Sequence, residues 1–228
     1  MRLNKYIAES GYCSRRKADE LIAQGRVTIN KHVAILGTSV EDSDIVRVDG
    51  EKIKIDTDYE YYLLYKPKNV ICTNSDKFGR ALAVDYIKSK KRLFTYGRLD
   101  YLTEGIIIVS NDGDTYNRVM HPRKELYKTY IARLDRPMQD RDLIRLEKGI
   151  LIDGKKTAPA KIKKIDEMEI KVSIYEGKNR QIRKMFENLH YDVKDLKRVT
   201  IGNFKVGNMK PGEYRKLTDE EIEYMKKL

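Results

Sequence analysis

The chain has 228 residues, which is enough for one large domain or two small ones with a core that needs no disulfide or metal. Lysine and arginine number 47 against 35 acidic residues, so the net charge is +12, while 40% of the residues are hydrophobic. These values exclude a disordered tail and favour a folded protein that binds a polyanion, most simply RNA or DNA. The two cysteines, Cys13 and Cys72, match no metal or redox spacing, so no disulfide scaffold or zinc site is expected and a reducing cytoplasm fits best.

Two short helices are predicted before residue 25, because apolar residues recur at helical spacing on either side of Gly11. Ser14 is a suitable N-cap for the second helix, and Gly25 is suited to end it. Apolar residues then alternate at positions 27 and 29, 33 and 35, and 46 and 48, with Asn30-Lys31 as a turn. Residues 1–50 are therefore predicted to form a small domain of helix, helix and small sheet.

A second domain is predicted at residues 59–228, after a polar linker at 51–58. Its helices are few, and one of them follows the turn Asn111-Asp112-Gly113. Strands are expected at 61–65, 105–110, 129–134, 160–165 and 169–174. The fold class is therefore α+β, with a mostly antiparallel mixed sheet and flanking helices in the second domain.

A late helix at 179–189 buries one apolar face, since its apolar residues follow the i, i+3, i+4, i+7 pattern. Arg180 and Lys184 face outward, whereas Arg183 lies at the edge of the apolar stripe, where its guanidinium can reach a neighbouring sheet or a ligand. The last helix begins at Thr218 with a capping box that Glu221 completes, and we interpret it as structural.

The strongest local candidate for chemistry is the glycine-bounded loop 97–105, which runs directly into a buried strand. Arg98 and Asp100 project to the same side if this loop is extended. From spacing alone, Asp100 is equally well explained as a cap for the next element or as the partner of an arginine.

Several blocks of this sequence resemble the motifs of a known family. The elements Gly-Arg-Leu-Asp, Thr-Glu-Gly and Asn-Asp-Gly within 97–113 resemble the catalytic motif of the RsuA-like family of ribosomal RNA pseudouridine synthases. Further matching blocks follow in the family's order, at 61–68, 121–123, 128–130 and 176–185. Residues 1–50 are similar to the small S-four-like (αL) RNA-binding domain that precedes this catalytic domain in many members. Asn69, where a glycine usually follows Lys-Pro-Lys, departs from the pattern at a turn position that tolerates asparagine.

The resemblance implies an isomerase that needs no cofactor and no metal, and that detaches a uracil, turns it and rejoins it through carbon. It implies Asp100 as the catalytic carboxylate, either as a nucleophile or as a stabiliser of charge on the sugar, and the sequence leaves both routes open. Arg183 would keep Asp100 ionised and aimed, and Tyr130 would stack on the base and assist proton removal.

A uridine in folded RNA must be flipped out of its stack, and Arg98 is the candidate to fill the vacated space. Further RNA-binding residues are expected in two basic helices, namely Arg15, Arg16, Lys17, Lys178, Arg180 and Lys184. The three histidines share no ligand spacing, so no metal is expected.

The expected partner is ribosomal RNA or a pre-ribosomal particle, with the small-subunit RNA favoured by chain length and domain order, and the protein is expected to be a monomer in the cytoplasm. No membrane span or signal sequence is expected, because the longest aliphatic run covers only residues 106–109. The alternatives are an enzyme for the large-subunit RNA, an enzyme for transfer RNA, and a ribosome-assembly protein that binds RNA without catalysis. The last alternative would not need Asp100.

Overall fold

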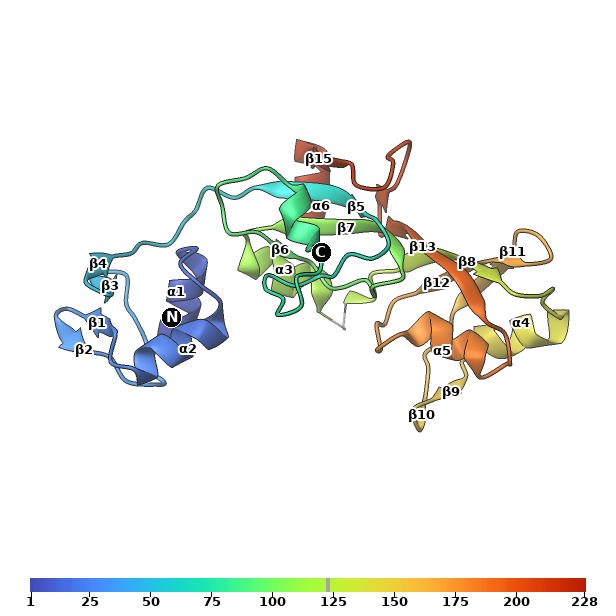
Figure 1. Cartoon of the computed structure of the whole chain (residues 1–228), viewed down its shortest axis with the longest axis horizontal. Helices are drawn as coiled ribbons and strands as arrows, with labels where there is room; N and C mark the ends of the chain where they lie inside the picture. The colour runs from blue at the N-terminus through green and yellow to red at the C-terminus, as the bar shows by residue number, and fades with distance from the viewer. Residues whose placement is uncertain (122–123) are drawn as a thin grey trace. The chain divides into compact units, whose positions relative to one another are not determined.

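The computed structural model describes residues 1–121 and 124–228 (Figure 1). Pro122 and Arg123, which belong to one of the family-like blocks, lie outside the described residues. The chain forms two compact units: the first comprises Met1–Glu60, Ser89–Leu93 and Ser110–Gly113, and the second comprises the remainder. Within the described residues, no helix is long and apolar enough to span a membrane.

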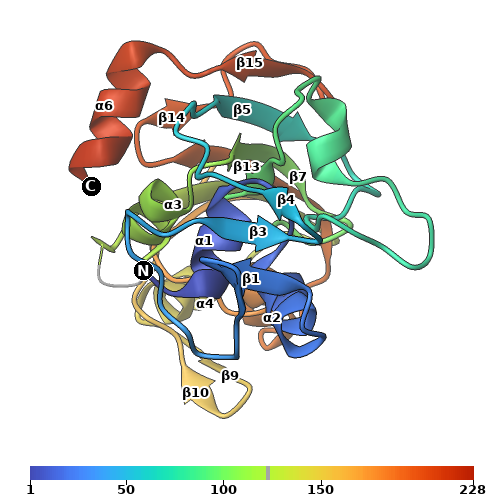
Figure 2. The ribbon, with the colours of Figure 1, turned by 90° about the vertical axis from the view of Figure 1, so that its left-hand side faces the viewer.

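The first unit contains two helices and a four-stranded antiparallel sheet, as the sequence predicts (Figure 2). The elements are α1 (Leu3–Glu9), α2 (Arg15–Ala23), β1 (Val27–Ile29), β2 (His32–Val33), β3 (Val46–Val48) and β4 (Glu51–Lys52), and the strand order is β2-β1-β3-β4. Ser14 caps α2, since its hydroxyl accepts from the backbone N–H of Lys17 at 3.2 Å. Asn30 and Lys31 both have positive φ, which is typical of a tight hairpin turn.

The core of the first unit is apolar and comes from both helices and the sheet. Its most buried side chains are Leu3, Ile7, Ala18, Val27, Val46 and Val48. Their spacing in the sequence is the helical or alternating spacing that predicted the elements. Arg15, Arg16 and Lys17 lie on the exposed side of α2.

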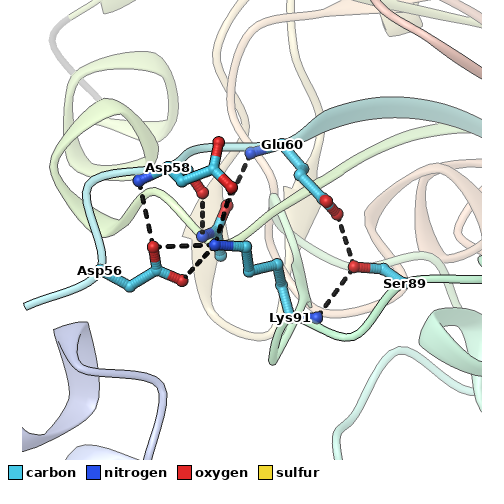
Figure 3. Close-up of polar contacts among 6 residues, drawn as sticks. Asp56, Asp58, Glu60, Ser89 and Lys91 are labelled. Carbon is cyan, nitrogen blue, oxygen red and sulfur yellow. Dashed lines mark hydrogen bonds and ion pairs between the residues drawn. The ribbon is translucent and has the colours of Figure 1, made fainter.

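The segment before the second unit is held by ion pairs (Figure 3). The Lys91 ammonium contacts the Asp56 carboxylate at 2.7 Å and the Asp58 carboxylate at 2.9 Å. Ser89 donates to the Glu60 carboxylate and accepts from the backbone N–H of Lys91. Residues 56–58, the end of the segment 51–58 that the sequence predicts to be a linker, and Glu60 are therefore anchored to the loop that carries Lys91.

The second unit is built on a nine-stranded mixed sheet, with main order β11-β12-β8-β13-β7-β5-β15 (Figure 1). Its strands are β5 (Tyr61–Lys66), β6 (Phe94–Thr95), β7 (Glu104–Ser110), β8 (Lys128–Leu134), β11 (Lys161–Lys164), β12 (Glu169–Ile174), β13 (Val193–Ile201), β14 (Phe204–Lys205) and β15 (Tyr214–Lys216). β13 pairs antiparallel with β8 and parallel with β7, so the predicted mixed sheet is confirmed. β9 (Leu151–Ile152) and β10 (Lys155–Lys156) form a separate hairpin.

Helices pack on this sheet. They are η1 (Ala83–Tyr86), α3 (Gly113–Met120), α4 (Asp140–Glu147), α5 (Gln181–Glu187) and α6 (Asp219–Lys227). α5 buries Ile182, Met185 and Phe186, the face that the helical spacing predicted, although the helix is shorter than 179–189. At the start of α6, the Thr218 hydroxyl accepts from the Glu221 N–H, and the Glu221 carboxylate accepts from the Thr218 N–H, a capping box that contributes about 1 kcal/mol.

Gly105 allows β7 and β13 to approach closely. Its φ is +121°, and a Cβ at this position would lie 2.2 Å from the backbone oxygen of Arg198. Gly105 and Arg198 are register partners in the parallel pairing. A side chain at position 105 would therefore push apart the two strands that lie at the centre of the sheet.

Lys66, at the end of β5, is fully buried and gives a pH-dependent prediction. Its ammonium donates to the backbone oxygens of Pro67 and Val70, both at 2.8 Å. Burial lowers its pKa from 10.5 to about 8. The unfolded chain therefore binds this proton more tightly than the folded chain, and the free energy of unfolding rises as the pH increases from about 8 to 10.5.

We expect the stability of the wild-type protein, relative to the Lys66→Met variant, to increase over this pH interval. Denaturant titrations of both proteins at several pH values measure the difference, in which the titration of all other groups cancels. A difference that stays constant or falls would contradict the burial of a charged Lys66.

Candidate active site

A cavity of about 490 Å³ opens in the second unit, between the loop before β7, the strands β8 and β13, and the start of α5. The residues that carry its polar chemistry are Arg98, Asp100, Thr103, Lys128, Tyr130, Lys178, Arg180, Gln181 and Arg198. Asp100 and Tyr130, which the resemblance nominated separately, thus line one cavity although they lie 30 positions apart in the chain.

The loop that carries Asp100 is held by backbone contacts. The backbone oxygen of Asp100 accepts from the Thr103 N–H at 3.0 Å, which closes a turn. The Asn69 N–H donates to the backbone oxygen of Tyr101 at 2.7 Å. Leu99 is buried, and its N–H donates to the Cys72 sulfur at 3.4 Å. The half-buried Asp100 side chain is thereby presented to the cavity from a fixed backbone.

Arg183 lies next to this loop but contacts it through a carbonyl. The guanidinium is buried and donates to the backbone oxygens of Val193 at 2.7 Å and Leu102 at 3.2 Å. Burial and the nearby Arg180 lower the pKa of Arg183, and the charge of Asp100 acts in the opposite direction. No described cation lies within 4.0 Å of the Asp100 carboxylate, so the direct pairing with Arg183 that we expected is not formed. α5 instead directs this guanidinium to backbone carbonyls and stabilises the loop.

Tyr130 has a cationic neighbour that the sequence analysis missed. Arg198 on β13 is the register partner of Tyr130 on β8, and both side chains line the cavity. One guanidinium nitrogen donates to the Tyr130 hydroxyl at 3.4 Å, and Nε donates to the backbone oxygen of Ile106 at 2.8 Å. Arg198 is only 3% exposed. The signal in the sequence was an arginine two positions after Leu196, on the face of the strand that Leu196 buries.

Lys128 was also missed. It stands two positions before Tyr130 on β8, lines the same cavity and donates to the backbone oxygen of Tyr175 at 3.0 Å. Burial, and then repulsion by Arg198, lowers its pKa from 10.5 to about 8. The interior of the cavity is therefore electropositive.

The predicted RNA-binding residues fall into three groups. Arg98, Lys178 and Arg180 line the cavity, where Lys178 pairs with Glu176 at 3.4 Å and Arg180 pairs with Glu187 at the same distance. Lys184 forms an ion pair with Asp153 and is not among the residues that line the cavity. Arg15, Arg16 and Lys17 belong to the first unit, on α2.

Within the described part of the chain, no group of three or more His, Cys, Asp or Glu side chains could hold a metal ion. The chemistry that the cavity offers is that of one carboxylate (Asp100), two phenols (Tyr116 and Tyr130) and several cations, of which Arg198 is buried.

Two known families match parts of this chain. The family described as RNA pseudouridylate synthase matches residues 60–188, and the S4 domain matches residues 1–46. The chain is 40% identical to the "Ribosomal large subunit pseudouridine synthase B" of Bacillus subtilis (strain 168), over 100% of this chain and 96% of that protein. It is 38% identical to the "Dual-specificity RNA pseudouridine synthase RluF" of Escherichia coli O6:H1, over 97% of this chain and 77% of that protein.

A solved structure gives the same result for the fold. The structure entitled "Crystal structure of pseudouridylate synthase" has a TM-score of 0.74 and 30% identity to this chain, and the match covers 99% of both chains. The predicted fold, an S-four-like domain followed by a pseudouridine synthase domain, is therefore confirmed. The cavity with Asp100 and Tyr130 lies in the unit that the catalytic family matches, and the chain belongs to the RsuA-like family of RNA pseudouridine synthases.

Proposed function

We propose that this enzyme converts a specific uridine of large-subunit ribosomal RNA to pseudouridine, with Asp100 as its catalytic carboxylate. The observation that carries the proposal is the cavity in which Asp100 shares its walls with Tyr130 and with several cations. The choice of RNA follows the relative from Bacillus subtilis, which is named for the large subunit. Our expectation of the small-subunit RNA has no support among these relatives, because chain length and domain order do not distinguish the two substrates.

The reaction rearranges one nucleoside and adds no atoms. The C1′–N1 bond breaks, its electron pair leaves with the uracil, and a C1′–C5 bond forms; the proton lost from C5 is balanced by a proton gained at N1. Asp100 can attack C1′ or stabilise the positive charge that develops on the sugar. Tyr130 would contact the base and assist the loss of the C5 proton. Reactant and product have the same oxidation state, so no redox cofactor is required.

The uridine must leave its stack to reach Asp100, at a cost of a few kcal/mol. Arg98 is exposed and lines the same cavity two positions before Asp100, which suits it to occupy the space that the nucleotide vacates. Lys178 and Arg180 would contact the flanking phosphates. Their ion pairs with acidic residues lie near the surface and contribute little to stability. Replacing these acidic partners with RNA phosphates therefore costs little free energy.

The first unit would serve substrate capture. Replacing Arg15 and Arg16 together by alanine removes two exposed cations from α2. We expect RNA affinity to fall about tenfold and the slope of log K against log salt to decrease by about 1 to 2, because each phosphate contact contributes about 0.9. The single-turnover rate at saturating RNA should not change.

Filter binding at several salt concentrations and single-turnover assays measure these quantities. The matched control is Lys52→Ala, which removes an exposed cation from β4 of the same unit. A lower single-turnover rate in the double variant, with unchanged affinity, would refute the assignment of α2 to capture.

The proposed function is tested by mapping pseudouridines in both ribosomal RNAs and in transfer RNA from cells that lack the gene. We expect one site in the large-subunit RNA to lose its modification, and the purified protein to restore it on a transcript without added metal or cofactor. Loss at a small-subunit site would overturn the choice of RNA, and no loss at any site would overturn the proposal. More than one kind of RNA is mapped because a relative is named dual-specificity.

A further inference from the structure

The described part of the chain leaves one cation in the cavity incompletely bonded. Arg198 makes two hydrogen bonds, to Ile106 and Tyr130, but no described residue accepts from its second terminal nitrogen, Nη2, which is buried. No described carboxylate lies within 4.0 Å of its guanidinium. An unpaired donor in the interior destabilises the folded protein, and more so when it is charged. Such a group is explained if a substrate supplies the missing acceptor.

The position of Arg198 indicates which part of a nucleotide it would meet. Arg98 and Arg180 are exposed, whereas Tyr130 and Arg198 are 9% and 3% exposed, so the latter pair forms the floor of the cavity. The phosphodiester backbone must continue on both sides of the flipped nucleotide and therefore stays near the mouth. The base, which ends the side branch, reaches deepest.

We propose that Nη2 of Arg198 donates to a carbonyl oxygen of the uracil and stabilises the negative charge that the ring carries when the C1′–N1 bond breaks. This inference rests on the proposed function. The electron pair of the broken bond is delocalised to O2 and O4, and a fixed cation at either oxygen stabilises this state more than the neutral ground state. The Arg198–Tyr130 hydrogen bond is long, at 3.4 Å, and Arg198 lines the cavity, so a side-chain shift that brings Nη2 to the base would break only a weak contact.

The charges around the site support an anionic leaving group. The positive charge of Arg198 repels the ammonium of Lys128 on the adjacent strand β8 and helps to lower the pKa of Lys128. Asp100 is the counterpart: it lines the same cavity from a different element, the loop before β7, and would face the sugar. A carboxylate on the sugar side and a cation on the base side separate the charges in the direction in which the bond breaks.

The test compares Arg198→Gln and Arg198→Lys with the wild-type protein on an RNA that the wild type converts. The target position carries uridine, 2-thiouridine or 4-thiouridine, since sulfur is a weaker hydrogen-bond acceptor than oxygen. We expect Arg198→Gln to lower the single-turnover rate about 100-fold with RNA affinity nearly unchanged, and Arg198→Lys, which keeps the charge, to lose less. The thio substitution at the oxygen that Arg198 contacts, either O2 or O4, should lower the single-turnover rate of the wild-type protein. The same substitution should not lower the rate of Arg198→Gln any further.

The controls separate the possible failures. Arg133→Gln removes an exposed arginine from β8 and should leave the rate unchanged. If Arg198→Gln does not fold, Arg198→Lys and the thio effects on the wild-type protein carry the test. The inference is overturned if neither thio substitution slows the wild-type protein, or if the thio substitution slows Arg198→Gln as much as it slows the wild type. It is also overturned if the rate difference between the wild type and Arg198→Gln disappears with a methylphosphonate at the target phosphate and not with a thiocarbonyl. The proposed function fails separately, if the wild type forms no pseudouridine on the unsubstituted RNA.

Discussion

Asp100→Asn is expected to abolish pseudouridine formation, lowering the single-turnover rate by at least about 10⁴-fold, while RNA affinity stays within about threefold of the wild type. An amide has nearly the same shape as the carboxylate, but it neither attacks C1′ nor stabilises positive charge on the sugar. Among residues 1–121 and 124–228, no hydrogen bond or ion pair of the Asp100 side chain holds the loop, which is fixed by backbone hydrogen bonds and by Leu99. The substitution should therefore not alter the fold.

Release of tritium from C5-labelled uridine RNA measures the rate, and filter binding measures the affinity. Asp140→Asn is the matched control, because it makes the same chemical change at an exposed position on α4 and should retain full activity. Measurable turnover by Asp100→Asn at a rate near the wild type would remove Asp100 from the reaction. An inactive variant that binds RNA normally would also exclude the alternative of a protein that only binds RNA.

Gly105→Ala is expected to destabilise the protein by roughly 3 kcal/mol or more. The new Cβ would lie 2.2 Å from the Arg198 oxygen and 2.5 Å from the Arg198 nitrogen, both backbone atoms, and φ at this position is +121°. Strain at such a φ costs about 1–3 kcal/mol, and overpacking adds about 1–3 kcal/mol. Relief requires β7 and β13 to separate, which would also displace Arg198 from Tyr130.

Gly154→Ala separates the two contributions, because Gly154 has φ +74° but no atom within 4 Å of its added Cβ. It should lose only about 1 kcal/mol from strain. Chemical denaturation of the three proteins gives the free energies of unfolding. Equal losses in Gly105→Ala and Gly154→Ala would show that the close approach of β7 and β13 does not limit stability.

The sequence predicted the elements whose apolar spacing is regular. The strands Glu169–Ile174 and Lys128–Leu134 and the apolar face of α5 are present where the alternation or the helical stripe placed them. β13 was not predicted, although it joins the two halves of the sheet. Charged residues interrupt its apolar pattern, and its register with β8 shifts twice, so the period of two that marks a strand is lost.

The candidate site was predictable only in part for a related reason. Asp100 and Tyr130 were nominated by a motif, and the structure places both at one cavity. Arg198 lies on the strand that the pattern missed, and its proximity to Tyr130 depends on pairing between residues 68 positions apart. Arg183 was placed correctly on its helix, but spacing along a helix does not show which acceptor a long side chain finds.

The Lys91 ion pairs limit where the N-terminal RNA-binding module of this protein can be replaced by the module of another protein. Ser89–Leu93 and Ser110–Gly113 belong to the first compact unit, so the chain passes between the units after Glu60, Lys88, Leu93, Val109 and Gly113. A chimera spliced at residue 58 would bring a foreign N-terminal module but retain Lys91 without Asp56 and Asp58. Successful grafting of a new RNA-binding module therefore requires these two acids, or the loop of Lys91, to be transferred with it.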